Sequence, residues 1–186
     1  INSTEDMFGG LDNHDMCAIA EYLEECGVDG LHVSRAVHLK DEYMWAPTGI
    51  HGGFSAELVE NIKKCVSIPV ITVGRYTEPQ FAEIMVKKGR ADLVAFGRQS
   101  LADPHMPLKA MEERLEDMTP CIACLQGCVA NMYAGQPICC LTNPVLGRES
   151  EGLPMAEKKK KVYVIGGGVA GMCVAFTAKR RGHDVT

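Results

Sequence analysis

The sequence lacks the features of a membrane-spanning, secreted or nucleic-acid-binding protein. It has no run of ~18 apolar residues that could span a bilayer, and no signal peptide is visible. Its 19 Lys and Arg against 24 Asp and Glu give a net charge of −5, whereas a phosphate-binding surface is expected to be basic. The basic run at 158–161 falls in a polar stretch that we interpret as a solvated linker. We therefore expect no membrane and no nucleic-acid partner.

Disulfide bonds are not expected to explain the nine cysteines. The chain has 186 residues, 46% of them hydrophobic, and is too long and too rich in core residues for a small secreted disulfide scaffold. Four cysteines lie singly in helical patterns and are expected to act as small buried hydrophobic residues: Cys17, Cys26, Cys65 and Cys173. This usage favours a reducing, cytoplasmic location.

The other five cysteines are concentrated in residues 121–140. Four of them form the spacing C-x2-C-x3-C-x11-C: Cys121, Cys124, Cys128 and Cys140. Thiolates bind zinc, copper(I) or iron–sulfur clusters. Zinc sites usually use two short pairs of ligands, whereas three grouped ligands and one remote ligand are typical of a 4Fe–4S cluster. The spacing favours 4Fe–4S over zinc or a metal-free group of buried thiols, and Cys139 is a second candidate for the fourth ligand.

Helical and strand patterns alternate through the first 115 residues. Helices are expected from the N-cap candidates Asp12 and Asn13 to about Cys26, after Ser55 as N-cap, over 78–88 and over roughly 106–115. Strands are expected over 30–34, 69–74 and 92–97. This order predicts βα units and a parallel sheet covered on both faces. Three strands cannot close a barrel and leave an exposed edge. The long loop over 35–54 is expected to be functional.

A glycine-rich motif follows the polar connector. Residues 162–165 are predicted to form a strand that runs into G-x-G-x-x-G and a helix. Gly166 permits the turn, Gly168 lets a pyrophosphate approach the helix N-terminus, and Gly171 lets the helix pack near the strand. The motif predicts dinucleotide binding. It does not distinguish FAD from NAD, because the acidic ribose-binding residue is expected ~20 residues further on.

Together these features resemble the iron–sulfur flavoenzyme branch of the old yellow enzyme family. That branch includes 2,4-dienoyl-CoA reductase, 2-enoate reductase, bile-acid-inducible enone reductases and trimethylamine dehydrogenase. The resemblance is carried by the segments GVDGLHVS, IPVITVGR, ADLVAFGRQSLADP, CIACLQGC, CCLTNP and VYVIGGGVAG. It implies an α/β fold in four parts: the C-terminal portion of an FMN-binding TIM (β/α)8 barrel with strands six to eight over 1–118, an iron–sulfur segment over 119–148, a linker over 149–161, and the truncated start of a Rossmann-like FAD/NAD(P)-binding domain over 162–186.

The resemblance also implies the cofactors FMN, FAD, NAD(P)H and a 4Fe–4S cluster. It selects Cys140 as the fourth cluster ligand, because the family position of Cys139 is often not a cysteine. The two glycine–arginine pairs, Gly74-Arg75 and Gly97-Arg98, stand at the ends of strands seven and eight, where TIM barrels often bind phosphate. We expect them to hold the FMN phosphate, the alternative being that the arginines pair with surface carboxylates.

His38 is the expected catalytic residue. It follows the strand LHVS by four residues and falls at the place of a family histidine that assists protonation. The alternative is a solvated loop histidine. The family's flavin-supporting arginine and proton-donor tyrosine would precede Ile1, so we expect this chain to be part of a larger protein and to be inactive by itself.

The resemblance implies reduction of the C=C bond of an α,β-unsaturated carbonyl compound, with electrons passing from NAD(P)H through FAD, the cluster and FMN. Two alternatives remain: an amine dehydrogenase of the trimethylamine dehydrogenase type, and a non-catalytic zinc-knuckle or dinucleotide-binding module. The sequence leaves the substrate, the nicotinamide preference and homo-oligomerisation open.

Overall fold

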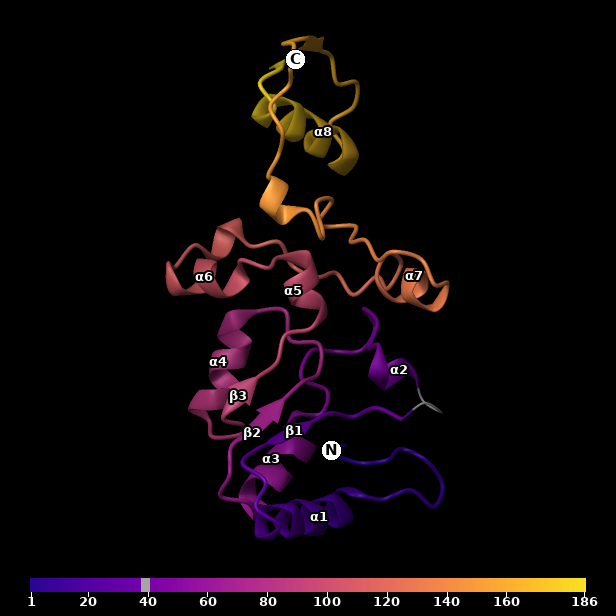
Figure 1. Cartoon of the computed structure of the whole chain (residues 1–186), viewed down its shortest axis with the longest axis vertical. Coiled ribbons are helices and arrows are strands. Elements are labelled where there is room, and N and C mark those ends of the chain that lie inside the picture. The colour runs from indigo at the N-terminus through magenta and orange to yellow at the C-terminus, as the bar shows by residue number, and fades with distance from the viewer. Residues whose placement is uncertain (38–40) are drawn as a thin grey trace. The chain divides into compact units, whose positions relative to one another are not determined.

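The computed structural model describes residues 1–37 and 41–186, which divide into two compact units, 1–144 and 145–186 (Figure 1). Residues 119–144, which carry the grouped cysteines, belong to the same unit as the preceding strands. The predicted catalytic residue His38 lies outside the described residues. In the described part of the chain, no helix is both long and apolar enough to cross a membrane.

The first unit is built on a three-stranded parallel sheet (Figure 1). Its strands lie in the order β1 (Leu31–Val33), β2 (Val70–Thr72) and β3 (Leu93–Val94). A single parallel bridge joins Asn2 to Ser34, just beyond the end of β1. The predicted parallel βα arrangement is therefore confirmed. The strands are shorter than expected: β1 pairs with β2 at three positions, and β2 pairs with β3 at two.

Helices cover one face of this sheet. α1 (Asn13–Glu25) and α3 (Ala56–Cys65) lie side by side, and α4 (Pro79–Lys87) lies beside β3 (Figure 1). Between helices and sheet lies a continuous apolar core: Met16, Ala20, Leu31, Val33, Val59, Ile62, Val66, Val70 and Ala91. His32, between two buried residues of β1, is exposed, and Leu93 is 52% exposed. The prediction that both faces are covered is thus wrong for the residues that the structure describes.

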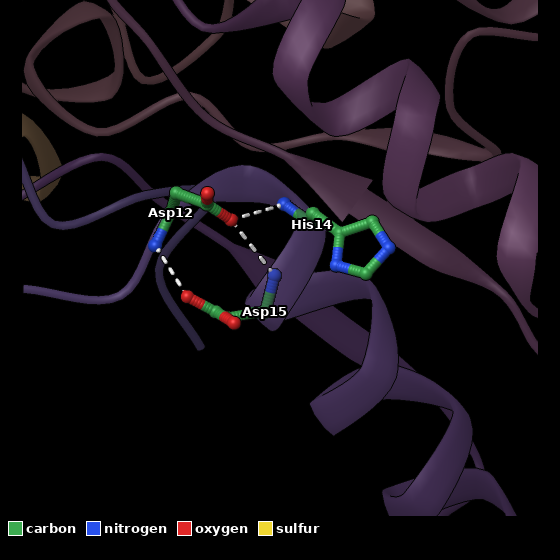
Figure 2. A group of neighbouring side chains, drawn as sticks. All are labelled: Asp12, His14 and Asp15. Atoms are coloured by element: carbon green, nitrogen blue, oxygen red, sulfur yellow. Dashed lines mark hydrogen bonds between the residues drawn. The ribbon is translucent and has the colours of Figure 1, made fainter.

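The N-terminus of α1 is held by a reciprocal capping box (Figure 2). The Asp12 carboxylate accepts the N–H groups of His14 at 2.8 Å and Asp15 at 3.0 Å, and the Asp15 carboxylate accepts the Asp12 N–H at 3.0 Å. The hydrogen bond from the Asp15 N–H lowers the pKa of Asp12. This arrangement confirms the predicted cap and accounts for the closeness of these exposed side chains.

α3 begins after Ser55 as predicted, but the Ser55 side chain does not cap it. The hydroxyl is buried and donates to the carbonyl of Val73 at 3.1 Å. Ser55 therefore ties the start of α3 to the chain just beyond β2, where the predicted phosphate-binding pair begins.

The remaining elements of the first unit are short. They are α2 (Asp41–Met44), α5 (Arg98–Ala102), α6 (Met106–Met111), a 3₁₀ turn (Leu115–Asp117) and α7 (Val129–Tyr133). α2 lies within the predicted loop, and α5 was not predicted. The helix expected over 106–115 ends early because Glu113 adopts a left-handed conformation (φ 56°) and the Arg114 N–H folds back to the Lys109 carbonyl.

The second unit contains a small βαβ arrangement. β4 (Lys161–Val162) and β5 (Asp184–Val185) pair in parallel on either side of α8 (Val169–Arg180), after a 3₁₀ turn at Glu149–Glu151. Gly168 stands at the N-cap of α8. A Cβ atom at Gly171 would lie 1.9 Å from the Gly166 carbonyl oxygen, so only glycine permits this close approach. The predicted strand–turn–helix context is present, with β4 shorter than the predicted strand.

Candidate functional site

A pocket of about 180 Å³ lies at the carboxyl ends of the three parallel strands. Each strand contributes the residues that follow it: Ser34, Arg35 and Ala36 after β1, Val73, Gly74, Arg75 and Tyr76 after β2, and Ala95, Gly97, Arg98 and Gln99 after β3. We call it the strand-end pocket. Parallel α/β proteins bind ligands at this end of their strands, because the loops that vary without disturbing the core gather there.

Both predicted glycine–arginine pairs line the strand-end pocket. Arg75 adopts a left-handed conformation (φ 55°), and its buried Nε atom has no hydrogen-bond partner. Neither Arg75 nor Arg98 is among the ion pairs that the structure describes. A buried donor without a partner is costly, so the pocket offers an unpaired cationic donor to an anionic ligand.

The long loop forms another wall of this pocket. The Arg35 guanidinium makes two hydrogen bonds to the Asp6 carboxylate, at 2.7 and 2.8 Å, and this ion pair raises the pKa of Arg35. The guanidinium carbon also lies 4.2 Å from the centroid of the Tyr43 ring, which stacks on Phe54 at 5.5 Å. This aromatic wall is thus held to the N-terminal segment by a paired charge.

A second pocket, of about 20 Å³, lies within the cysteine segment. We call it the cysteine pocket; its lining includes the five cysteines Cys121, Cys124, Cys128, Cys139 and Cys140. Ala123 (φ 52°) and Leu125 (φ 61°) both adopt left-handed conformations in the loop that carries the first three cysteines. Such conformations are costly for residues with a side chain and concentrate at functional sites. The five cysteines thus meet at one small cavity. That their thiols bind a metal stays a prediction.

Arg98 and Cys121 line both pockets. Burial raises the pKa of the Cys121 thiol, and the hydrogen bond from the Ala123 N–H and the Arg98 charge act in the opposite direction. Burial lowers the pKa of Arg98, which nearby ionised cysteines would raise. The guanidinium therefore lies between the two pockets, close to the predicted thiolate ligands.

Cys139 and Cys140 have different surroundings. Cys140 lies close enough to Cys121 for the two thiolates to repel each other, and its Sγ is 3.3 Å from the Thr142 hydroxyl. The Cys139 sulfur accepts the Asn131 amide at 3.7 Å, and the Cys139 N–H donates to the Gly127 carbonyl at 2.9 Å. Both residues line the cysteine pocket, so the choice of Cys140 as fourth ligand stays a prediction.

Polar residues of α5 and the turn after it, which the sequence interpretation missed, anchor the cysteine segment. The Gln99 side chain is 1% exposed; it accepts the Cys121 N–H at 2.8 Å and donates to the Thr119 carbonyl at 3.0 Å. Asp103 accepts the Thr119 N–H at 3.0 Å. At the other end, the Asn143 amide donates to the Leu101 carbonyl at 2.9 Å. Gln99 and Asp103 lie in the segment ADLVAFGRQSLADP, and Asn143 lies in CCLTNP. Polar residues within these family segments could have indicated the anchoring contacts.

Comparison with known proteins places these features in a family. The family model described as "NADH:flavin oxidoreductase / NADH oxidase family" matches residues 2–117. The chain is 46% identical over 170 residues to an NADH oxidase of Thermoanaerobacter brockii, covering 90% of this chain and 26% of that protein. It is 37% identical over 180 residues to a cinnamate reductase of Clostridium sporogenes, covering 95% of this chain and 27% of that protein.

Solved structures give the same result. A 2-naphthoyl-CoA reductase complex superposes with a TM-score of 0.88 at 33% identity, covering 100% of this chain and 29% of that one. Histamine dehydrogenase from Rhizobium sp. 4-9 superposes with a TM-score of 0.86 at 27% identity, covering 97% and 27%. The chain spans about a quarter of the length of these relatives. It belongs to the NADH:flavin oxidoreductase / NADH oxidase family, which confirms the resemblance drawn from its motifs.

Proposed function

We propose that the intact protein containing this chain is an NAD(P)H-dependent flavin and iron–sulfur oxidoreductase. Its reaction would be reduction of the C=C bond of an α,β-unsaturated carbonyl compound. The observation that carries this proposal is the adjacency of the two pockets, which share Arg98 and Cys121. Similarity to proteins named cinnamate reductase and 2-naphthoyl-CoA reductase supports this substrate class.

The strand-end pocket fits an FMN phosphate. The unpaired Nε of Arg75 and the Arg98 guanidinium offer charged donors, and arginine forks match phosphate geometry. The pocket's 180 Å³ is less than the roughly 300–1,000 Å³ of a typical small-molecule site. In this proposal β1, β2 and β3 are the last three strands of a TIM barrel, residues 1–118 are its C-terminal portion, and the other strands complete the pocket.

The spacing of the cysteine sulfurs favours a 4Fe–4S cluster over a single zinc ion. With Zn–S bonds of about 2.3 Å, four tetrahedral sulfurs lie only about 3.8 Å apart. In residues 1–37 and 41–186, the one group of three potential ligand atoms all within 4.8 Å of one another is Asp12, His14 and Asp15, not the cysteines. A cubane holds its ligand sulfurs farther apart because irons and sulfides lie between them. In this proposal residues 119–148 form the cluster segment, with Cys121, Cys124, Cys128 and Cys140 as ligands.

The second unit would bind a dinucleotide, FAD or NAD(P)H. Gly166, Gly168 and Gly171 bring the backbone to the N-terminus of α8 with no side chain in the way, and that terminus attracts a pyrophosphate. Residues 149–161 would form the linker to this Rossmann-like domain, which would begin at 162. When bound, the flavins and the cluster would supply hydride and single-electron transfer.

His38 would hydrogen-bond the substrate carbonyl oxygen. This role rests on its position in the sequence, four residues after LHVS. The test is a His38→Ala variant of the intact protein, whose rate of cinnamate reduction should fall while flavin and iron content stay unchanged. An unchanged rate would exclude the role.

The whole proposal is tested first by cofactor content. The intact protein, purified without oxygen, should contain about four irons and four sulfides per chain, show flavin absorbance, and oxidise NADH or NADPH when cinnamate or another enoate is added. One zinc per chain without sulfide or flavin would overturn the proposal in favour of a zinc-binding or dinucleotide-binding module.

Amine oxidation is the second candidate, favoured by the structural similarity to histamine dehydrogenase. Such an enzyme would bind a substrate cation against aromatic rings. In the strand-end pocket, the Arg35 guanidinium already lies over the Tyr43 ring, which leaves that ring less available to an ammonium group. Parallel assays with enoates and with methylamines or histamine separate the two reactions. Turnover of the amines alone would replace the reductase proposal.

A further inference from the structure

We infer that Thr48 and Tyr133 are positioning residues that connect the wall of the strand-end pocket to the cysteine loop, so that occupancy of either pocket strengthens binding in the other. We call the segment 45–48, with its contacts to the cysteine segment, the latch. The inference rests on the proposed function for the identity of the two bound groups, FMN and the cluster. Its geometry does not depend on that identity.

The latch consists of hydrogen bonds between segments that are distant in the sequence. The Thr48 hydroxyl donates to the Ile122 carbonyl at 2.7 Å, and a weaker contact reaches the Ala123 carbonyl at 3.4 Å. Three residues before Thr48, the Trp45 Nε1–H donates to the Tyr133 hydroxyl on α7 at 3.0 Å. These partners are 74 to 88 residues apart in the chain. The latch therefore holds the cysteine segment at two separate points, on either side of Cys124 and Cys128.

One end of the latch is part of the strand-end pocket. Trp45 and Ala46 both line it, and Ala46 is only 1% exposed. The Trp45 carbonyl also accepts a long hydrogen bond, 3.5 Å, from Arg98. A movement of the latch thus displaces pocket-lining atoms together with a predicted phosphate ligand.

The other end holds the backbone that orients the predicted cluster ligands. The two carbonyls that Thr48 contacts belong to Ile122 and Ala123, which lie between Cys121 and Cys124 in the chain. Ala123 is in a left-handed conformation, which persists only when its surroundings enforce it. A group bound by the thiols would enforce it, and Thr48 transmits that order to the pocket wall. By thermodynamic linkage, order in the wall must favour the cysteine loop equally.

The hydrogen bonds of the latch can be deleted without changing buried core residues. Thr48 is exposed and Tyr133 is 63% exposed, so Thr48→Val and Tyr133→Phe delete one hydrogen-bonding group each and keep the shape of the side chain. Matched controls are Tyr22→Phe, at 65% exposure on α1, and Thr177→Val, on the exposed surface of α8. All four variants are expected to fold.

The experiment measures FMN affinity of the intact protein with the cluster in place and after removal of the cluster by an oxidant and a chelator. Loss of the cluster should weaken FMN binding about 3- to 30-fold in the unchanged protein, as expected for one or two hydrogen bonds. In the double variant Thr48→Val/Tyr133→Phe, FMN binding should already be weak with the cluster present and should change less than twofold on its removal. Hydrogen exchange should speed up in both 42–50 and 121–133 of this variant and in neither control.

Equal weakening on cluster removal in the double variant and in the unchanged protein would overturn the inference, because the coupling would then bypass the latch. So would unchanged exchange in 42–50. Failure of the proposed function is distinguishable, since the protein would then contain no flavin or no iron. The exchange measurement still decides whether the latch joins the two segments in that case.

Discussion

Arg98 and Cys121 each line both the strand-end pocket and the cysteine pocket, and the guanidinium charge acts on the thiol, lowering the pKa that burial raises. Arginine keeps its charge at any pH at which the protein is folded. A fixed cation that lines both pockets stabilises negative charge on either side, whether on a phosphate or on a thiolate-ligated centre. One side chain therefore influences the electrostatics of both sites.

The predicted phosphate contact of Arg75 can be tested with a ligand that lacks the phosphate. Arg75→Gln should weaken FMN binding about 10- to 100-fold, because it removes charge-assisted hydrogen bonds. Riboflavin binding should change little. Titration of the flavin-free intact protein with both flavins, followed by flavin fluorescence, gives the comparison. An equal loss for FMN and riboflavin would show that Arg75 supports the pocket rather than the phosphate.

The choice of Cys140 over Cys139 predicts an asymmetric pair of variants. Cys140→Ala should abolish a stable 4Fe–4S cluster, since a missing thiolate opens one corner of the cubane to oxygen and water. Cys139→Ala should keep most of the iron, because in our proposal Cys140 completes the cluster and the Cys139 sulfur accepts the Asn131 amide. Iron and sulfide content after anaerobic purification is the measurement. The reverse pattern would assign the fourth ligand to Cys139.

Gly127 has no room for a side chain. A Cβ atom there would lie 2.5 Å from the Cys139 carbonyl oxygen and 2.8 Å from the Cys139 sulfur. Gly127→Ala should push residues 139 and 140 away from the pocket and lower the iron content several-fold. Gly49→Ala, where the added methyl group meets open space, is the matched control. Full iron incorporation in Gly127→Ala would mean that the close contact relaxes without moving Cys140.

We expect the contact between Asp103 and Thr119, at the start of the cysteine segment, to weaken at acid pH. Burial alone would raise the pKa of Asp103, but hydrogen bonds from Lys109, Thr119 and His105 lower it overall. Because the folded-state pKa of Asp103 is lowered, its ionised carboxylate stabilises the fold at pH values above its unfolded-state pKa of about 3.9. This stabilisation is lost as the pH falls through the folded-state pKa. Protection of the Thr119 amide against hydrogen exchange should therefore decrease below about pH 4.

The matching variant is Asp103→Asn. Its side-chain NH2 group cannot accept a hydrogen bond, so it would face a donor from Lys109, Thr119 or His105 without forming one. Amide protection at Thr119 should fall about 5- to 100-fold at pH 7, as expected for lost charge-assisted hydrogen bonds, and the difference from the unchanged protein should shrink at acid pH. Glu83→Gln, in the exposed i,i+4 pair with Lys87, should leave it unchanged. A constant difference between pH 7 and pH 3 would rule out Asp103 as the titrating group.

The bounds of α1 and α4 agree with the sequence prediction to within about two residues, and α3 begins where it was expected, after Ser55. α1, α3 and α4 each present apolar residues at helical spacing, and each buries part of that stripe in the core, whereas Ile84 of α4 stays 45% exposed. α5 was missed because its five residues are too few to show a period. The Ser55 hydroxyl was assigned to a cap from its residue type, but burial beside Val73 gave it a different acceptor.

The sequence alone determined which residues gather in each local motif, and from these motifs it predicted a metal centre and a dinucleotide site. Three cysteines lie within eight residues, and the glycine motif spans six. Residues this close in the chain lie near one another in any fold, so both motifs can be read from the sequence. Only the tertiary structure decided which distant segments meet: that Gln99 and Asp103 anchor the cysteine segment, and that Thr48 reaches Ile122. Such contacts depend on how successive βα units stack, because that stacking sets which strand-end loops lie beside the cysteine segment.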